Sequence, residues 1–189
     1  MTVRLLLHTC CGPCLLGSID HILDYDITVL YYNPNLSDEN EYNIRLQALK
    51  TSVNYINSTF NKNIDIIAVD FNPTSFYSCI RGYERCVEGG ERCKKCIYER
   101  MEFTANLCSD KFDIFATTLT LSPHKDCEYI NTIGKGLAMK YNTEYLPSNF
   151  KKNDGFLKSV RRSKELNIYR QKYCGCIYSR VDTAENEPA

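Results

Sequence analysis

Seven of the eleven cysteines stand in three short groups, and they are the side chains most able to do chemistry in this chain. A thiolate binds metals and exchanges electrons with other sulfurs. The groups lie far apart along the sequence, so folding would have to assemble them into one site. They are Cys10, Cys11 and Cys14; Cys93 and Cys96; and Cys174 and Cys176. We therefore expect a metal–sulfur centre that carries out redox chemistry.

The cellular compartment decides how such thiols are interpreted. No apolar run approaches the ~20 residues that cross a bilayer, and the first residues lack the pattern of a signal peptide. We expect a cytoplasmic protein without membrane contact, where structural disulfides are rare and grouped thiols indicate metal binding or catalysis. Four cysteines outside the groups are expected to be small, buried or half-buried hydrophobes: Cys79, Cys86, Cys108 and Cys127.

Two cysteine pairs have the Cys-x-x-Cys spacing that lets two sulfurs bind one metal. Cys11 with Cys14 and Cys93 with Cys96 could together form a closed tetrahedral zinc site. That zinc site would use four of the seven grouped cysteines and leave the other three without a role as ligands. A four-iron cluster also takes four thiolates, and a neighbouring metal or a dithiol would use the rest. The surplus of thiols therefore favours redox chemistry over structural zinc.

The third group, Cys174-Gly175-Cys176, differs from the other two. One intervening glycine makes chelation of a single metal awkward but allows a strained disulfide, and strained disulfides are the labile ones. We expect a reversible two-electron store next to the metal centre. The alternative is that one or both of these cysteines are plain metal ligands.

Hydrophobic periodicity predicts the elements that must position these cysteines. Short apolar runs predict strands over Val3–Leu7, Ile27–Tyr32, Ile64–Val69, Ile114–Leu121 and Thr143–Leu146. Helical spacing predicts helices over Cys14–Tyr25, Glu41–Phe60, Lys94–Cys108 and Asp126–Tyr141, and the second of these should bury Ile44, Ala48, Val53 and Ile56. Alternating strands and helices favour an α/β fold with a Rossmann-like parallel sheet and helices on both faces. We expect one catalytic domain over residues 1–180 and a disordered tail over 181–189.

Two predicted loops should face one crevice. In parallel sheets, ligands bind beyond the carboxyl ends of the strands. The loop with Cys10 and Cys14 follows the first predicted strand, and the residues from Ser122 to Asp126 follow the fourth. These two loops are therefore expected to form the walls of the site.

Positive charge gathers in residues 151–172. Eight basic side chains there stand against two acidic ones, with aromatic residues interleaved. This composition suits contacts with the phosphates and stacked bases of RNA, although a solvated helix face would look the same. The candidate RNA-binding residues are Lys151, Lys152, Lys158, Arg161, Arg162 and Arg170.

Six motifs, spread in order over nearly the whole chain, carry a family resemblance. They are His8-x-Cys10-Cys11-x-Pro13-Cys14, Tyr32-Asn33-Pro34-Asn35, Glu41-Tyr42-x-x-Arg45, Gly89-Gly90-x-Arg92-Cys93-x-x-Cys96, Thr117-Thr118-Leu119-x-x-Ser122-Pro123 and Tyr169-Arg170-Gln171-x-Tyr173-Cys174-Gly175-Cys176. Together they resemble the QueH type of epoxyqueuosine reductase. The set is far more specific than any single motif.

The resemblance implies a fold like that of the nucleotide alpha-hydrolase (HUP-like) group and the last step of queuosine biosynthesis. In that step the epoxide of epoxyqueuosine, in the wobble base of a tRNA anticodon, is reductively deoxygenated to queuosine. The implied partners are this tRNA and an unidentified electron donor.

The resemblance also implies roles for the grouped cysteines. Cys10, Cys11, Cys93 and Cys96 would hold a 4Fe-4S cluster, and Cys174 and Cys176 would form a redox-active disulfide. Cys14 would hold a second metal beside the cluster, a mononuclear iron or another ion. Removal of the epoxide oxygen as water consumes two protons, for which His124, Asp126 and Tyr32 are candidate donors.

Two other classes of function share some of these features. A nucleotide-activating enzyme that modifies tRNA on the same fold would need a glycine-rich phosphate loop after the first strand, where cysteines stand instead. A zinc-stabilised RNA-binding module without catalysis would need only four of the cysteines. Iron and sulfide in the anaerobically purified protein would separate the reductase from the zinc module.

Overall fold

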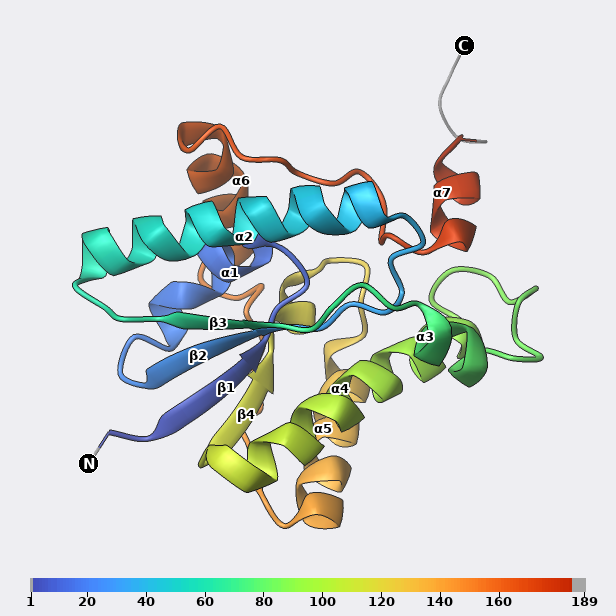
Figure 1. Cartoon of the computed structure of the whole chain (residues 1–189), viewed down its shortest axis with the longest axis horizontal. Coiled ribbons are helices and arrows are strands. Elements are labelled where there is room, and N and C mark those ends of the chain that lie inside the picture. Colours follow the sequence, from blue (N-terminus) through green and yellow to red (C-terminus); the bar gives the residue numbers. More distant parts are fainter. Residues whose placement is uncertain (1, 185–189) are drawn as a thin grey trace.

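A five-stranded parallel sheet lies at the centre of the computed structural model, which describes residues 2–184 (Figure 1). The strands are β1 (Arg4–His8), β2 (Asp26–Tyr31), β3 (Asp65–Ala68), β4 (Ile114–Thr117) and β5 (Glu144–Tyr145). Their order in space is β3-β2-β1-β4-β5, and every neighbouring pair is parallel. The predicted α/β class with a Rossmann-like parallel sheet is confirmed.

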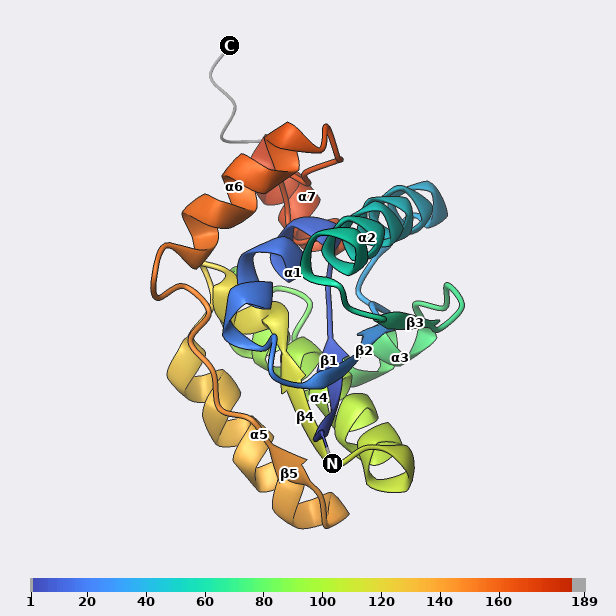
Figure 2. The ribbon, with the colours of Figure 1, turned by 90° about the vertical axis from the view of Figure 1, so that its left-hand side faces the viewer.

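Helices cover both faces of the sheet (Figure 2). The helices are α1 (Gly12–Ser18), α2 (Glu39–Phe60), α3 (Thr74–Cys79), α4 (Glu91–Lys111), α5 (Cys127–Tyr141), α6 (Gly155–Glu165) and α7 (Ile177–Ala184), with 3-10 turns η1 (Ile19–His21) and η2 (Thr118–Leu121). Helices α1 and α2 cover one face and α4 and α5 the other, while α6 lies on the outer side of α1. No helix in the described part of the chain is both long and apolar enough to span a membrane.

The central strand shows why the sheet needs two helical layers. Leu5, Leu6 and Leu7 of β1 are all fully buried. Leu5 and Leu7 belong to the core beneath α1 and α2, whereas Leu6 belongs to the core beneath α4 and α5. A strand that buries successive side chains on opposite faces is typical of a parallel sheet covered on both sides.

Several predicted elements are shorter in the structure, and two of them show the physical reason. The strand predicted over Ile114–Leu121 ends at Thr117, whose side chain accepts a hydrogen bond from the Leu119 backbone and so caps η2. The helix predicted over Cys14–Tyr25 starts earlier, because Pro13 suits a first turn, and gives way to η1 after Ser18. Local propensity indicated regular elements here, but capping and tertiary contacts ended them.

Two further expectations are corrected. Ile44 is 46% exposed, because α2 turns Arg45, Ala48, Val53 and Ile56 inward instead. The chain continues as α7 to Ala184, so the backbone is helical in the first four residues of the expected tail, and residues 185–189 lie outside the described part.

Candidate metal–sulfur site

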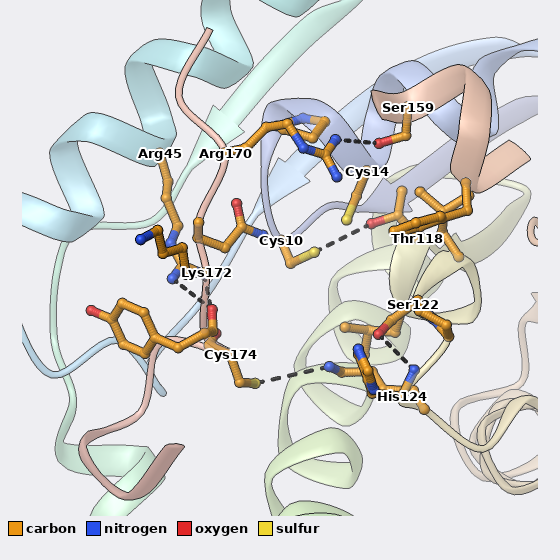
Figure 3. A pocket seen from close by; sticks show the side chains of 18 of the residues that line it. Cys10, Cys14, Arg45, Thr118, Ser122, His124, Ser159, Arg170, Lys172 and Cys174 are labelled. Atoms are coloured by element: carbon orange, nitrogen blue, oxygen red, sulfur yellow. Dashed lines mark hydrogen bonds between the residues drawn. The ribbon is translucent and has the colours of Figure 1, made fainter. Parts of the chain in front are cut away.

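A cavity of about 600 Å³ opens at the carboxyl ends of β1 and β4 (Figure 3). The strand order places the topological switch point of the sheet between these two strands, which is where open α/β sheets bind ligands. Cys10, from the loop after β1, and Cys14, in the first turn of α1, face Ser122 and His124, from the segment after β4. The expectation that both loops face one crevice is confirmed.

Three thiols meet on one side of this cavity. The sulfurs of Cys10, Cys11 and Cys14 all lie within 4.8 Å of one another. Hydrogen bonding with the Cys11 and Cys14 thiols holds the pKa of the Cys10 thiol well below its usual value. Hydrogen bonding with the Cys10 and Cys11 thiols raises the pKa of Cys14. The Nε2 of Gln171 donates a hydrogen bond to the Cys11 sulfur at 3.0 Å. Among the described side chains, these three cysteines are the only group of three or more potential ligands whose donor atoms lie close enough together to hold a single metal ion.

The other four grouped cysteines lie near one another. Cys96 and Cys176 are buried in one small apolar cluster. Burial, and then the nearby Cys174 and Cys176 thiols, raise the pKa of Cys96 to about 12, and the pKa of Cys93 is raised by the same causes. Cys174 lines the cavity, whereas Cys93 and Cys96, on α4, are not among the residues that line it. All eleven cysteines are free thiols in the structure.

Arg100 lies between the three-thiol group and the other four grouped cysteines. Its guanidinium lines the cavity and is buried. Burial lowers the pKa of Arg100, but the Cys96, Cys174 and Cys10 thiols outweigh that effect and raise it. Arg100 also shares the cavity lining with Cys10, Cys14 and Cys174 and donates to the Cys96 carbonyl, so residues of all three cysteine groups lie around one cation.

Arg45 fixes the backbone of the third cysteine group. Its guanidinium donates to the carbonyls of Cys174 at 3.1 Å and Tyr173 at 3.2 Å, and it pairs with Glu41 at 2.7 Å. Gly175 has a φ of +115°, and a Cβ there would collide with Leu36 and lie 3.1 Å from the Arg45 guanidinium. The middle position of this motif thus requires glycine.

The candidate proton donors have different surroundings. His124 is exposed on the rim of the cavity. Asp126 is not among the residues that line it; its carboxylate accepts from the Glu128 and Tyr129 backbones and caps α5. Tyr32 is also outside the lining, hydrogen-bonded to Ser75 and Glu99. Of the three, the geometry favours His124.

His8 is a packing residue. Its Nε2 donates to the Tyr32 carbonyl at 3.0 Å, so its Nδ1 accepts from the Thr117 hydroxyl at 2.8 Å. Burial, aided by the charge of Arg100, lowers the pKa of His8 to about 4. The imidazole is therefore neutral at physiological pH and joins β1 to β2 and β4.

Part of the basic segment is used inside the fold. Arg162 pairs with Asp20 at 2.9 Å, donates to the Leu16 carbonyl at 2.7 Å, and is only 12% exposed. Lys158 pairs with the same Asp20 at 3.0 Å. These contacts fasten α6 to α1 and its following turn, so neither side chain presents a free charge to RNA.

The other candidate RNA-binding residues lie nearer to solvent or the cavity. Lys152 and Arg161 are exposed, and Arg161 is 3.7 Å from Glu165. Lys151 is half-buried and donates to the Lys125 carbonyl. Arg170 lines the cavity, 3.0 Å from the Ser159 hydroxyl (Figure 3).

Comparison with known proteins agrees with this geometry. A family model described as epoxyqueuosine reductase QueH matches residues 5–182. The chain belongs to the QueH family. A QueH of Streptococcus pyogenes serotype M1 is 38% identical over 177 residues, covering 93% of this chain and 69% of that protein. A QueH of Thermotoga maritima is 35% identical over 182 residues, covering 95% and 92%. The family resemblance drawn from the motifs is confirmed.

Three residues of this QueH family member's site were missed as site residues from sequence. Arg100 lies one helical turn after Cys96, and that spacing places both on one face of α4. Gln171 stands within a quoted motif, but nothing in the sequence pairs it with Cys11. The Nζ of Lys125 lies 3.9 Å from the Cys174 sulfur, and the charge of that thiol raises the pKa of Lys125. In the sequence, the only indication that Lys125 belongs to the site is that it directly follows His124, a candidate site residue.

Proposed function

We propose that this chain reduces epoxyqueuosine to queuosine in the wobble position of a tRNA anticodon. The observation that carries the proposal is that Cys10 and Cys14 of the three-thiol group line one cavity with Cys174 at the switch point of the sheet. The substrate in this proposal is the one that the names of the relatives give. The cavity has room for a base and has reactive thiols in its lining.

The donor set fits a metal–sulfur centre. Thiolates are the ligands of iron–sulfur clusters, and the cavity surrounds its thiols with basic side chains and one acidic residue, Glu88. We assign Cys10, Cys11, Cys93 and Cys96 to a 4Fe-4S cluster and Cys14 to a second metal. Each thiolate of such a cluster binds a different iron, so its ligands need not lie as close together as those of one ion. When bound, the cluster supplies electrons one at a time.

The Cys174 and Cys176 thiols can provide the electrons and protons that the reaction consumes. Deoxygenation breaks two C–O bonds, forms one C=C bond and releases the oxygen as water, which consumes two electrons and two protons. Oxidation of the Cys174 and Cys176 thiols to a disulfide releases two electrons and two protons. An external electron donor would then reduce that disulfide. His124, on the cavity rim, is the candidate to relay protons.

The cavity rim suits a base from a tRNA loop. Proteins that read RNA sequence mostly bind unpaired bases that are splayed from loops and stacked on aromatic or guanidinium planes. Phe156, Arg170 and Tyr173 line the cavity, and the Arg170 guanidinium lies 5.9 Å from the Phe156 ring centre. We propose that the anticodon loop enters beside α6.

Anaerobic purification followed by iron, sulfide and zinc analysis tests the cofactor, and turnover of epoxyqueuosine tRNA on the same sample tests the activity. We expect a brown protein that contains iron and sulfide and converts the nucleoside. A colourless protein with stoichiometric zinc and no turnover would instead support the RNA-binding module.

Gly175→Ala should slow turnover by about ten- to a hundredfold, the scale of a displacement near 1 Å at a reacting group. The added methyl would push the thiol pair away from Leu36 and Arg45. Gly136→Ala is the matched control, because nothing lies within 4 Å of its Cβ position. Unchanged turnover in Gly175→Ala, with normal metal content in both variants, would show that the placement of the pair is not critical.

Arg161→Ala and Arg162→Ala should have different effects, because we assign Arg161 to RNA binding and Arg162 to the stability of the fold. Loss of the exposed Arg161 charge should weaken tRNA binding and reduce the slope of log affinity against log salt by up to about 1. Loss of Arg162 should leave that slope unchanged but lower the free energy of unfolding by about 1.5–3 kcal/mol. Its hydrogen bonds to the Asp20 carboxylate and the Leu16 carbonyl are lost, although Lys158 still pairs with Asp20. Salt-dependent binding and denaturant unfolding measure the two effects; equal slopes in both variants would refute the distinction.

A further inference from the structure

Arg100 is a buried cation without an acidic partner. Its side chain is 2% exposed, and its hydrogen bonds, to the Cys96 carbonyl and the Asn33 side chain, are both 3.4 Å long. Among the side chains of residues 2–180, no carboxylate lies within 4.0 Å of its guanidinium. Arg45 is equally buried but has Glu41 at 2.7 Å.

The nearest acid in the sequence does not pair with this cation. Glu99 precedes Arg100 on α4 and raises its pKa less than the Cys96, Cys174 and Cys10 thiols do. Its carboxylate accepts the hydrogen bond of the Tyr32 hydroxyl instead. A charge removed from water is strongly destabilising unless an opposite charge faces it. A guanidinium cannot escape this penalty by losing its proton.

The cysteine groups lie around Arg100. Its side chain lines the same cavity as Cys10, Cys14 and Cys174, and its Nε donates to the Cys96 carbonyl. A cysteine that binds a metal is a thiolate. The site therefore gains its missing negative charge when the metal–sulfur centre is loaded.

We infer that Arg100 is the fixed counter-charge of the metal–thiolate centre, and that it helps to retain the centre and raises its reduction potential. A positive charge held nearby favours the reduced form, which carries one more negative charge. This inference rests on the proposed metal–sulfur function and goes beyond it, because it assigns a role to a residue that binds neither metal nor substrate.

Arg100→Met and Arg100→Lys test the inference, with Arg162→Met as a matched loss of a mostly buried arginine outside the cavity. Each variant is compared with wild type in the apo form by circular dichroism and thermal melting. Each is then loaded anaerobically, and its iron and sulfide content, midpoint potential and tRNA affinity are measured.

Apo Arg100→Met should fold and melt no lower than apo wild type, because a charge without a partner has been removed. After loading, it should hold less iron or show a lower midpoint potential, and Arg100→Lys should recover part of the difference. Arg162→Met should melt lower and, when loaded, keep the wild-type potential.

Three results would overturn the inference. Apo Arg100→Met could be unfolded or melt far below wild type, which would make Arg100 a structural residue. Loaded Arg100→Met could match wild type in iron, sulfide and potential. It could also bind tRNA more weakly at an unchanged potential, which would make Arg100 a substrate-binding residue. If wild type holds only zinc, the proposed function fails, and zinc retention in the same variants then decides the role of Arg100.

Discussion

Cys174→Ser and Cys176→Ser are each expected to abolish multiple turnover while the metal content stays near that of wild type. Serine cannot exchange electrons, so the loss should be at least about a thousandfold, on the scale of removing an essential reactive group. The backbone of the motif should keep its place, because Arg45 binds the carbonyls of Tyr173 and Cys174 and not the thiols. Turnover and iron content of the same anaerobic samples provide the measurement.

Cys127→Ser is the matched control for this pair. Cys127 lies outside the cavity lining and donates a hydrogen bond to the Ser148 carbonyl, which serine can also donate. It should therefore be active. Loss of metal together with activity in Cys174→Ser or Cys176→Ser would favour the alternative that these cysteines are plain ligands. Full turnover in both would remove the thiol pair from the reaction.

Cys11→Ser should lose most of its bound metal and all measurable turnover. Cys11 is buried, shares the three-thiol group, and receives the Gln171 hydrogen bond, so its replacement removes a ligand that no nearby side chain can supply. Because a ligand that binds only the folded state raises stability, loaded wild type should melt higher than apo wild type. The loaded and apo forms of Cys11→Ser should have the same melting temperature.

Cys14→Ser separates the two metals of the proposal. If Cys14 holds a second metal beside a four-iron cluster, this variant should keep sulfide at the wild-type level and lose about one metal equivalent. Loss of all iron and sulfide would instead make Cys14 a cluster ligand. Metal retained in Cys11→Ser at the wild-type level would contradict the assignment of the three-thiol group.

Residue spacing was enough to predict most of the fold, because its signals are local. Short apolar runs located all five strands, although β4 and β5 are shorter than expected. Asp38 caps α2 as a helix-capping residue should. The Ile44 error arose because the apolar positions of α2 are too sparse to define its buried face, which includes Arg45 and Ser52.

The sequence by itself also determined the family and the loop after β1 as a thiol site, since three cysteines in five residues must lie close together. Only the tertiary structure decided which distant groups meet. It placed Cys176 in one buried cluster with Cys96, used Arg162 to fasten α6 to α1, and left Arg100 in the thiol-lined cavity without a carboxylate partner. These outcomes depend on contacts between segments tens to more than a hundred residues apart. The charge of a side chain and its spacing in the sequence indicate what it can bind. Which group it contacts in the folded protein depends on how the helices pack around the sheet.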